Sequence, residues 1–68
     1  MTGHILPAAA MEKLLKKVGA PRVSQGAKES LREVLENYGE QIGDKAVKLA
    51  AHSGRKTVKS EDVKLAVK

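Results

Sequence analysis

Two short stretches of the sequence combine cations with groups that bind phosphate. Arg22 follows a Gly-Ala-Pro turn, and Arg55, Lys56 and Thr57 follow a Ser-Gly pair. Phosphate oxygens accept hydrogen bonds from guanidinium, ammonium and hydroxyl groups and from free backbone N–H groups near helix starts. A lone arginine such as Arg22 also fits a narrow DNA minor groove, where the negative potential is strong. Charged loops are also commonly just solvated, and composition alone does not separate these interpretations.

The distribution of charge favours a polyanion-binding surface. The formal net charge is +5. Residues 1–24 contribute +3 (four Lys or Arg, one acid), residues 25–50 contribute −1 (four and five), and residues 51–68 contribute +3 (five and two). Solubility does not require this layout, whereas a surface built from both ends of the chain and directed at a nucleic acid does.

The sequence gives little support for an active site or a metal-binding site. The sequence has no Cys, which excludes disulfides and thiolate metal sites, and His4 and His52 have no ligand-like companions. His52, Ser53 and Asp62 are the residue types of a hydrolytic triad, but nothing indicates an oxyanion-binding element or a substrate pocket. We therefore expect no cofactor, no metal and no enzymatic activity.

A membrane location is not indicated either. No apolar run approaches the roughly 20 residues that cross a bilayer, and the first residues do not have the pattern of a signal peptide. We expect a soluble, cytoplasmic protein.

Local signals predict an all-α chain. Pro7 suits the first turn of a short helix, which Gly19 ends because glycine adopts the left-handed cap conformation. Ser24 is a candidate N-cap for a long helix that runs to about His52 without proline, and Gly54 supplies its C-terminal cap.

A final short helix is predicted after the basic loop. Glu61 and Asp62 follow Ser60 and place two acids at the positive end of the helix dipole. The predicted order is therefore short helix, long helix, short helix, in a single domain over residues 1–68. Whether residues 1–5 are ordered is left open.

The long helix predicts a partner chain. Its apolar stripe comprises Ala27, Leu31, Val34, Leu35, Tyr38, Ile42, Ala46, Leu49 and Ala50. Two short helices cannot cover a stripe of this length, whereas a second copy that crosses it can. We infer a symmetric dimer, in which a head-to-tail arrangement brings Arg22 of one chain beside Lys56 and Thr57 of the other.

Three further features are open to a functional and a structural interpretation. Lys13, Lys16 and Lys17 form a basic helix face that either contacts DNA or is simply solvated. Arg55 and Asp62, seven positions apart, are candidates for an ion pair that fixes the loop between them. No helix carries the Asn, Gln and Arg cluster that would read base edges.

These residues resemble those of archaeal histones. The resemblance rests on Arg22-Val23-Ser24, on the run from Leu49 to Val58, which contains His-Ser-Gly-Arg-Lys-Thr-Val, and on Glu61-Asp62-Val63. It extends from Leu6 to Val67, nearly the whole chain. It implies a histone fold, a handshake dimer, and an architectural chromatin protein that wraps and compacts double-stranded DNA with little sequence preference, associated with the chromosome or nucleoid.

The resemblance also implies roles for single residues. Arg22 would enter the minor groove with support from Thr57, Lys56 would contact phosphate, and Lys13 would contact DNA at the dimer centre, where relatives commonly have Arg. The remaining implied roles are the dimer–dimer interface of Leu49, His52 and Asp62, the ion pair of Arg55 with Asp62, and close stacking of superhelical turns at Gly19. Pro21 departs from the acid that relatives often carry.

A second hypothesis stays open beside this one. The chain is then a histone-fold subunit of a sequence-dependent transcription regulator and pairs with a different chain. A stable homodimer and equal affinity for unrelated DNA sequences would argue against it. Co-assembly with other histones is compatible with both hypotheses.

Overall fold

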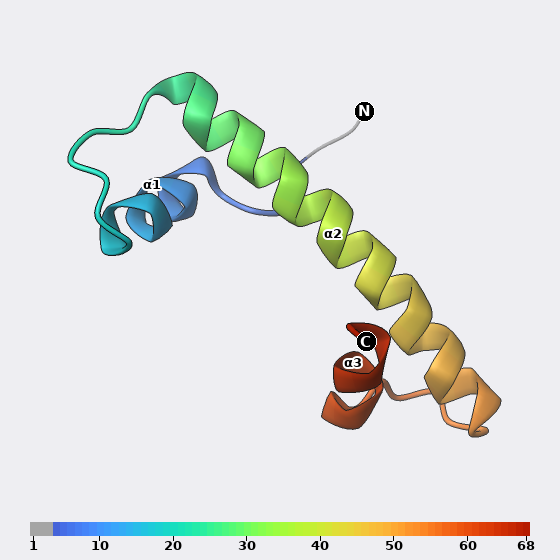
Figure 1. Ribbon diagram of the computed structural model, residues 1–68. Coiled ribbons are helices and arrows are strands. Elements are labelled where there is room, and N and C mark those ends of the chain that lie inside the picture. The colour runs from blue at the N-terminus through green and yellow to red at the C-terminus, as the bar shows by residue number, and fades with distance from the viewer. Residues whose placement is uncertain (1–3) are drawn as a thin grey trace. The chain divides into compact units, whose positions relative to one another are not determined.

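The fold consists of three helices in the order expected from the sequence. The structure, a computed structural model, describes residues 4–68. Within them, α1 (Ala8–Lys17), α2 (Gln25–His52) and α3 (Ser60–Ala66) follow one another without a strand (Figure 1). This confirms the all-α, short–long–short arrangement of the histone fold. None of the helices in this part of the chain is both long enough and apolar enough to span a bilayer.

The helix ends follow from local chemistry. Pro7 is the N-cap of α1, one position before the helix. At the start of α2, Ser24 Oγ accepts a hydrogen bond from the backbone N–H of Ala27 at 3.0 Å, which satisfies a donor that the helix leaves free. Gly19 has φ of 114° and Gly54 has φ of 75°, in the region that side chains disfavour. Glycine is therefore required just beyond α1 and α2.

The chain divides into two compact units, the first ending at Asn37 and the second comprising Tyr38–Lys68. In the first unit, Met11 of α1 is buried, and Glu12 lies 3.5 Å from the ammonium of Lys28 in α2. In the second unit, α3 and the last part of α2 pack through small side chains. Each short helix is therefore held by the part of α2 that belongs to its own unit.

The core within one chain is small. Among the described residues, the buried apolar side chains are Met11, Ala46, Ala50 and Ala66. Val34 and Tyr38 belong to the apolar stripe of α2 but are 61% and 53% exposed. The described residues therefore leave part of the stripe uncovered, and apolar surface of this kind is costly to leave in water.

The first residues of the described chain are held on α2. Glu36 accepts hydrogen bonds from the backbone N–H groups of Ile5 and Leu6, both at 2.7 Å, and from the His4 ring at 3.0 Å. Residues 1–3 lie outside the described residues, so the sequence question about order in residues 1–5 is answered here only for His4 and Ile5. These two residues are tied to the middle of the long helix.

Candidate nucleic-acid interface

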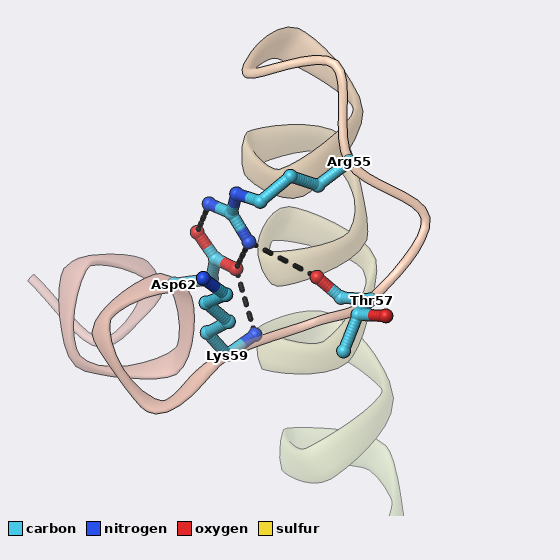
Figure 2. Close-up of polar contacts among 4 residues, drawn as sticks. All are labelled: Arg55, Thr57, Lys59 and Asp62. Carbon is cyan, nitrogen blue, oxygen red and sulfur yellow. Dashed lines mark hydrogen bonds and ion pairs between the residues drawn. The ribbon is translucent and has the colours of Figure 1, made fainter.

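An ion pair braces the second basic loop. Nη1 and Nη2 of Arg55 donate to the two carboxylate oxygens of Asp62, each at 2.9 Å, in a bidentate arrangement (Figure 2). Nη1 also donates to the carbonyl oxygen of Thr57 at 3.0 Å, and the backbone N–H of Lys59 donates to Asp62 at 2.8 Å. One guanidinium and one carboxylate therefore fix three points of the loop, including its entry into α3.

The carboxylate of Asp62 is charged at neutral pH despite its burial. Asp62 is 3% exposed. Hydrogen bonds from Arg55 and from the backbone of Lys59 lower the pKa of Asp62 from 3.8 to about 2, because they stabilise the ionised form more than burial penalises it. The same contact raises the pKa of Arg55. The guanidinium of Arg55 is thus engaged in contacts within its own chain.

Lys56 and Thr57 occupy the braced loop and are exposed. The carbonyl of Thr57 points toward Arg55, whereas its hydroxyl points away from the ion pair (Figure 2). The hydroxyl of Thr57 and the ammonium of Lys56 are therefore free to meet an external anion. Their backbone is already ordered, so less conformational entropy is lost on binding.

Both basic loops begin with the same turn. After α1, the N–H of Ala20 donates to the carbonyl of Leu15 at 3.0 Å and the N–H of Gly19 to that of Lys16 at 3.1 Å. After α2, the N–H of Arg55 donates to the carbonyl of Ala50 and that of Gly54 to Ala51, both at 2.9 Å. These are the two bonds of a Schellman motif. The glycines foreseen in the sequence thus set the direction of each loop.

The first loop presents Arg22 to solvent. Arg22 is exposed, and within residues 4–68 it takes part in none of the ion pairs. Arg22 and Gly19 belong to the first unit, whereas Lys56 and Thr57 belong to the second. The juxtaposition of the two loops across a dimer stays a prediction.

The lysines of α1 differ in their surroundings. The ammonium of Lys16 lies 3.1 Å from Glu12, one helical turn earlier, and Lys28 approaches the same carboxylate. These contacts, that of Lys16 first, lower the pKa of Glu12. Lys13 is exposed and has no ion-pair partner in the described part of the chain. Of the two lysines assigned to DNA, Lys13 is the one whose charge is free.

The residues assigned to the dimer–dimer interface differ in exposure. His52 is the exposed last residue of α2, and Leu49 is half-buried. Asp62 is buried, and both its oxygens already accept hydrogen bonds from Arg55. A contact from His52 of another dimer would therefore have to share the carboxylate with that guanidinium.

Glu36 was not foreseen as a structural residue. Its donors include two backbone N–H groups about 30 positions earlier, and backbone groups have no signature in a sequence. Three hydrogen bonds, of which that from Leu6 is the strongest influence, lower the pKa of Glu36. Only the presence of a free carboxylate in the middle of a long helix could have suggested a contact.

A three-helix chain that presents cations on two ordered loops is suited to contacting a nucleic-acid backbone without reading its bases. Comparison with known proteins identifies the family to which this chain is similar. A family model described as histone-like transcription factor (CBF/NF-Y) and archaeal histone matches residues 4–67. The chain is 54% identical over 63 residues to an archaeal histone HAN1 subunit of Thermococcus zilligii, covering 93% of this chain and 94% of the relative. It is 49% identical, with the same coverage, to probable archaeal histone 3 of Methanocaldococcus jannaschii.

The chain therefore belongs to the histone-fold family of archaeal histones and CBF/NF-Y-like proteins. It is a histone-fold DNA-binding chromatin protein and not an enzyme, as the sequence indicated, and dimerisation is typical of its family.

Proposed function

We propose that this protein binds, wraps and compacts double-stranded DNA with little sequence preference, as dimers that join into larger assemblies. The observation that carries the proposal is the braced loop, in which Arg55 and Asp62 order the backbone while Lys56 and Thr57 stay exposed. Such a loop offers a charge and a hydroxyl at a fixed position and no side chain suited to a base edge.

Each cation has a separate task in this proposal. Arg22 enters the minor groove, with Thr57 in support, and Lys56 contacts a phosphate. Lys13 binds the DNA backbone near the dimer centre. Lys16 contributes less there because its ammonium already forms an ion pair with Glu12. Loops from two chains come together at each end of the dimer, and the exposed part of the α2 stripe is what the second chain covers.

Assembly beyond the dimer uses two further features. Leu49, His52 and Asp62 join one dimer to the next, with His52 bonding to Asp62 of the neighbour. Gly19 allows successive superhelical turns to approach closely. A side-chain carbon added at Gly19 would meet no atom of residues 4–68 within 4 Å beyond its two neighbours along the chain, so the space beside it is open to a neighbouring molecule. In the cell, such assemblies associate with the chromosome.

The decisive measurement is affinity for three DNA duplexes of equal length and unrelated sequence, by fluorescence anisotropy over a series of salt concentrations. We expect similar affinities and a steep fall with salt. The slope of log K against log salt should become shallower by about 0.9 for each phosphate contact that Lys56→Ala removes. Lys64→Ala removes the same charge from an exposed position with no proposed contact and should leave the slope near its original value. A strong preference for one duplex would refute non-specific wrapping.

Digestion of the DNA complex by a nuclease tests the assembly. A ladder of protected lengths that grows by about one dimer per step supports an open series of dimers, whereas one fixed length supports a closed particle. Protection that is independent of protein concentration and limited to a single dimer would contradict assembly through Leu49, His52 and Asp62.

The family description also includes transcription factors, which favours a second candidate function. In that case the chain is one component of a sequence-dependent regulator and needs a different histone-fold chain. Light scattering separates the two, because a stable homodimer that binds all three duplexes equally removes the need for a foreign partner.

A further inference from the structure

The N-terminal strap, residues His4–Leu6, is held on α2 by a single carboxylate. Oε2 of Glu36 accepts hydrogen bonds from the backbone N–H groups of Ile5 and Leu6, both at 2.7 Å. Oε1 accepts one from the His4 ring at 3.0 Å. Every side-chain hydrogen bond of the strap within the described residues therefore ends on Glu36, so a competitor for this carboxylate is enough to release the strap.

Arg32 is placed to be that competitor. It lies four positions before Glu36 on α2, the spacing at which opposite charges pair on the surface of a helix. Within residues 4–68, however, Arg32 takes part in none of the ion pairs. Its Nε is buried without a hydrogen-bond acceptor, which carries a desolvation penalty. The docked strap thus coexists with an unsatisfied cation one turn away.

Other carboxylates near Arg32 do not replace Glu36. Glu29 lies three positions before Arg32, within reach along a helix, but the two form no ion pair in the described structure. Glu33 is the next residue in sequence, and adjacent side chains of a helix do not face each other. All three of these residues line one pocket of about 420 Å³ together with His4, so the guanidinium and the strap border the same space.

We propose that the N-terminal strap switches between a docked and a released state, and that an ion pair of Arg32 with Glu36 stabilises the released state. In the docked state, both oxygens of Glu36 are occupied by donors of the strap. In the released state, the carboxylate turns to the guanidinium, which can take both oxygens in a bidentate pair. The two sets of donors compete for the same acceptor, so one contact forms as the other is lost.

The switch acts on a surface that the apolar stripe does not include. Val34 of the stripe precedes Glu36 by two positions, which is about 200° around an α-helix. The strap and the stripe therefore lie on opposite faces of α2, and a second copy that covers the stripe leaves the strap accessible. Ile5 on the docked strap is 84% exposed. Docking and release thus change the outer surface of a dimer and not the surface between its chains.

Removal of the competitor should make the strap more stable. In Arg32→Gln, the released state loses its ion pair, so amide hydrogen exchange at Ile5 and Leu6, measured by NMR, should slow by up to about 2-fold, the scale of one pair at this spacing. Lys45→Gln removes the same charge from an exposed position on α2 without an ion-pair partner in the described chain, and exchange should not change. In a Glu36→Gln background, Arg32→Gln should have no effect, because the two residues act through one contact.

Removal of a donor from the strap should have the opposite effect on Arg32. Ile5→Pro lacks the backbone N–H that Glu36 binds, so the carboxylate should turn to Arg32 more often. The Nε–H resonance of Arg32 should then move downfield as the guanidinium gains a charged acceptor. Ile5→Ala is the matched control, since it truncates the exposed side chain but keeps the N–H group, and the Arg32 resonance should stay in place.

Three results would overturn the switch. Unchanged or faster exchange in Arg32→Gln would mean that Arg32 is neutral toward the strap or holds it in place. An equal effect of Arg32→Gln with and without Glu36 would remove the shared carboxylate as the link. The third is an Arg32 resonance that Ile5→Pro leaves unmoved. None of these measurements requires DNA, so their outcome is separate from that of the proposed function.

Discussion

Arg55 and Asp62 join through two parallel hydrogen bonds of 2.9 Å, which give the arginine of the second basic loop a structural role within its own chain. The guanidinium also holds the carbonyl of Thr57. One cation therefore orders the backbone from which its neighbours Lys56 and Thr57 project.

Removal of the carboxylate should therefore weaken DNA binding even though it makes the protein more positive. Asp62→Asn loses the ionic contact to Arg55, and we expect Tm to fall by several degrees, because even a small loss of unfolding free energy shifts the Tm of a domain of this size measurably. DNA affinity should fall several-fold. Asp44→Asn is the matched control: it removes the same charge from an exposed pair with Lys48 and should leave DNA affinity equal or slightly higher. Equal affinity changes in the two variants would mean that net charge, and not loop order, governs binding.

The free energy of unfolding should depend on pH because the carboxyl group of Asp62 titrates at different pH values in the folded and unfolded chain. The pKa of Asp62 is about 2 in the folded chain against an ordinary 3.8, so the folded state favours the ionised form. Its contribution is fully present above about pH 4 to 5 and is lost as the pH falls toward 2. Urea unfolding of wild type and Asp62→Asn over this range should show a difference that is constant at higher pH and shrinks on acidification. A difference that persists unchanged to pH 2 would assign the effect to packing.

The ends of the helices were predictable because their causes are local. Gly19 and Gly54 have the positive φ values that a Schellman turn requires, and Ser24 caps a donor only three residues away. The pair of Arg55 with Asp62 was also a candidate from the sequence, since a loop of seven positions brings its ends within reach. Short separations along the chain leave few alternative partners.

Contacts between distant segments were not predictable in the same way. The attachment of residues 4–6 to Glu36 depends on backbone donors about 30 positions away, and residue types do not indicate where a backbone N–H group will donate. The acidic neighbour of Lys16 was visible as a one-turn spacing, but the approach of Lys28 to the same carboxylate depends on how α1 packs on α2. Adjacency of the two basic loops requires a second chain, so one chain cannot decide it.

The lysines of α1 should differ in their importance for DNA binding. Lys16 must leave Glu12 before it can pair with a phosphate, whereas Lys13 has no such competitor in the described chain. We expect Lys13→Ala to weaken binding several-fold and to make the salt dependence shallower, with a smaller effect from Lys16→Ala. Lys17→Ala changes charge equally on the same helix and serves as the control. Equal losses for all three variants in an anisotropy titration would indicate a diffuse basic face instead of a specific contact.

Glu36 should control the order of the N-terminal residues. In Glu36→Gln, one carboxylate oxygen becomes an amide nitrogen that cannot accept hydrogen bonds, and the remaining oxygen is a weaker acceptor for the N–H groups of Ile5 and Leu6. Amide hydrogen exchange at these two residues, measured by NMR, should accelerate several-fold. Wild type should show the same loss of protection in acid, judged against the intrinsic exchange rate at each pH. The pKa of Glu36 is lowered on folding, so the contact is intact at neutral pH and is lost only as the pH falls below the ordinary range of a glutamate.

Two variants show whether the carboxylate acts through the backbone or through the ring of His4. His4→Ala removes the 3.0 Å ring contact but leaves both backbone hydrogen bonds, so exchange at Ile5 and Leu6 should change little. Glu33→Gln alters charge by the same amount one turn earlier on α2 and should also have little effect. If His4→Ala instead matched Glu36→Gln, the histidine would be the anchor, because the two backbone bonds would then be insufficient to hold the segment against α2.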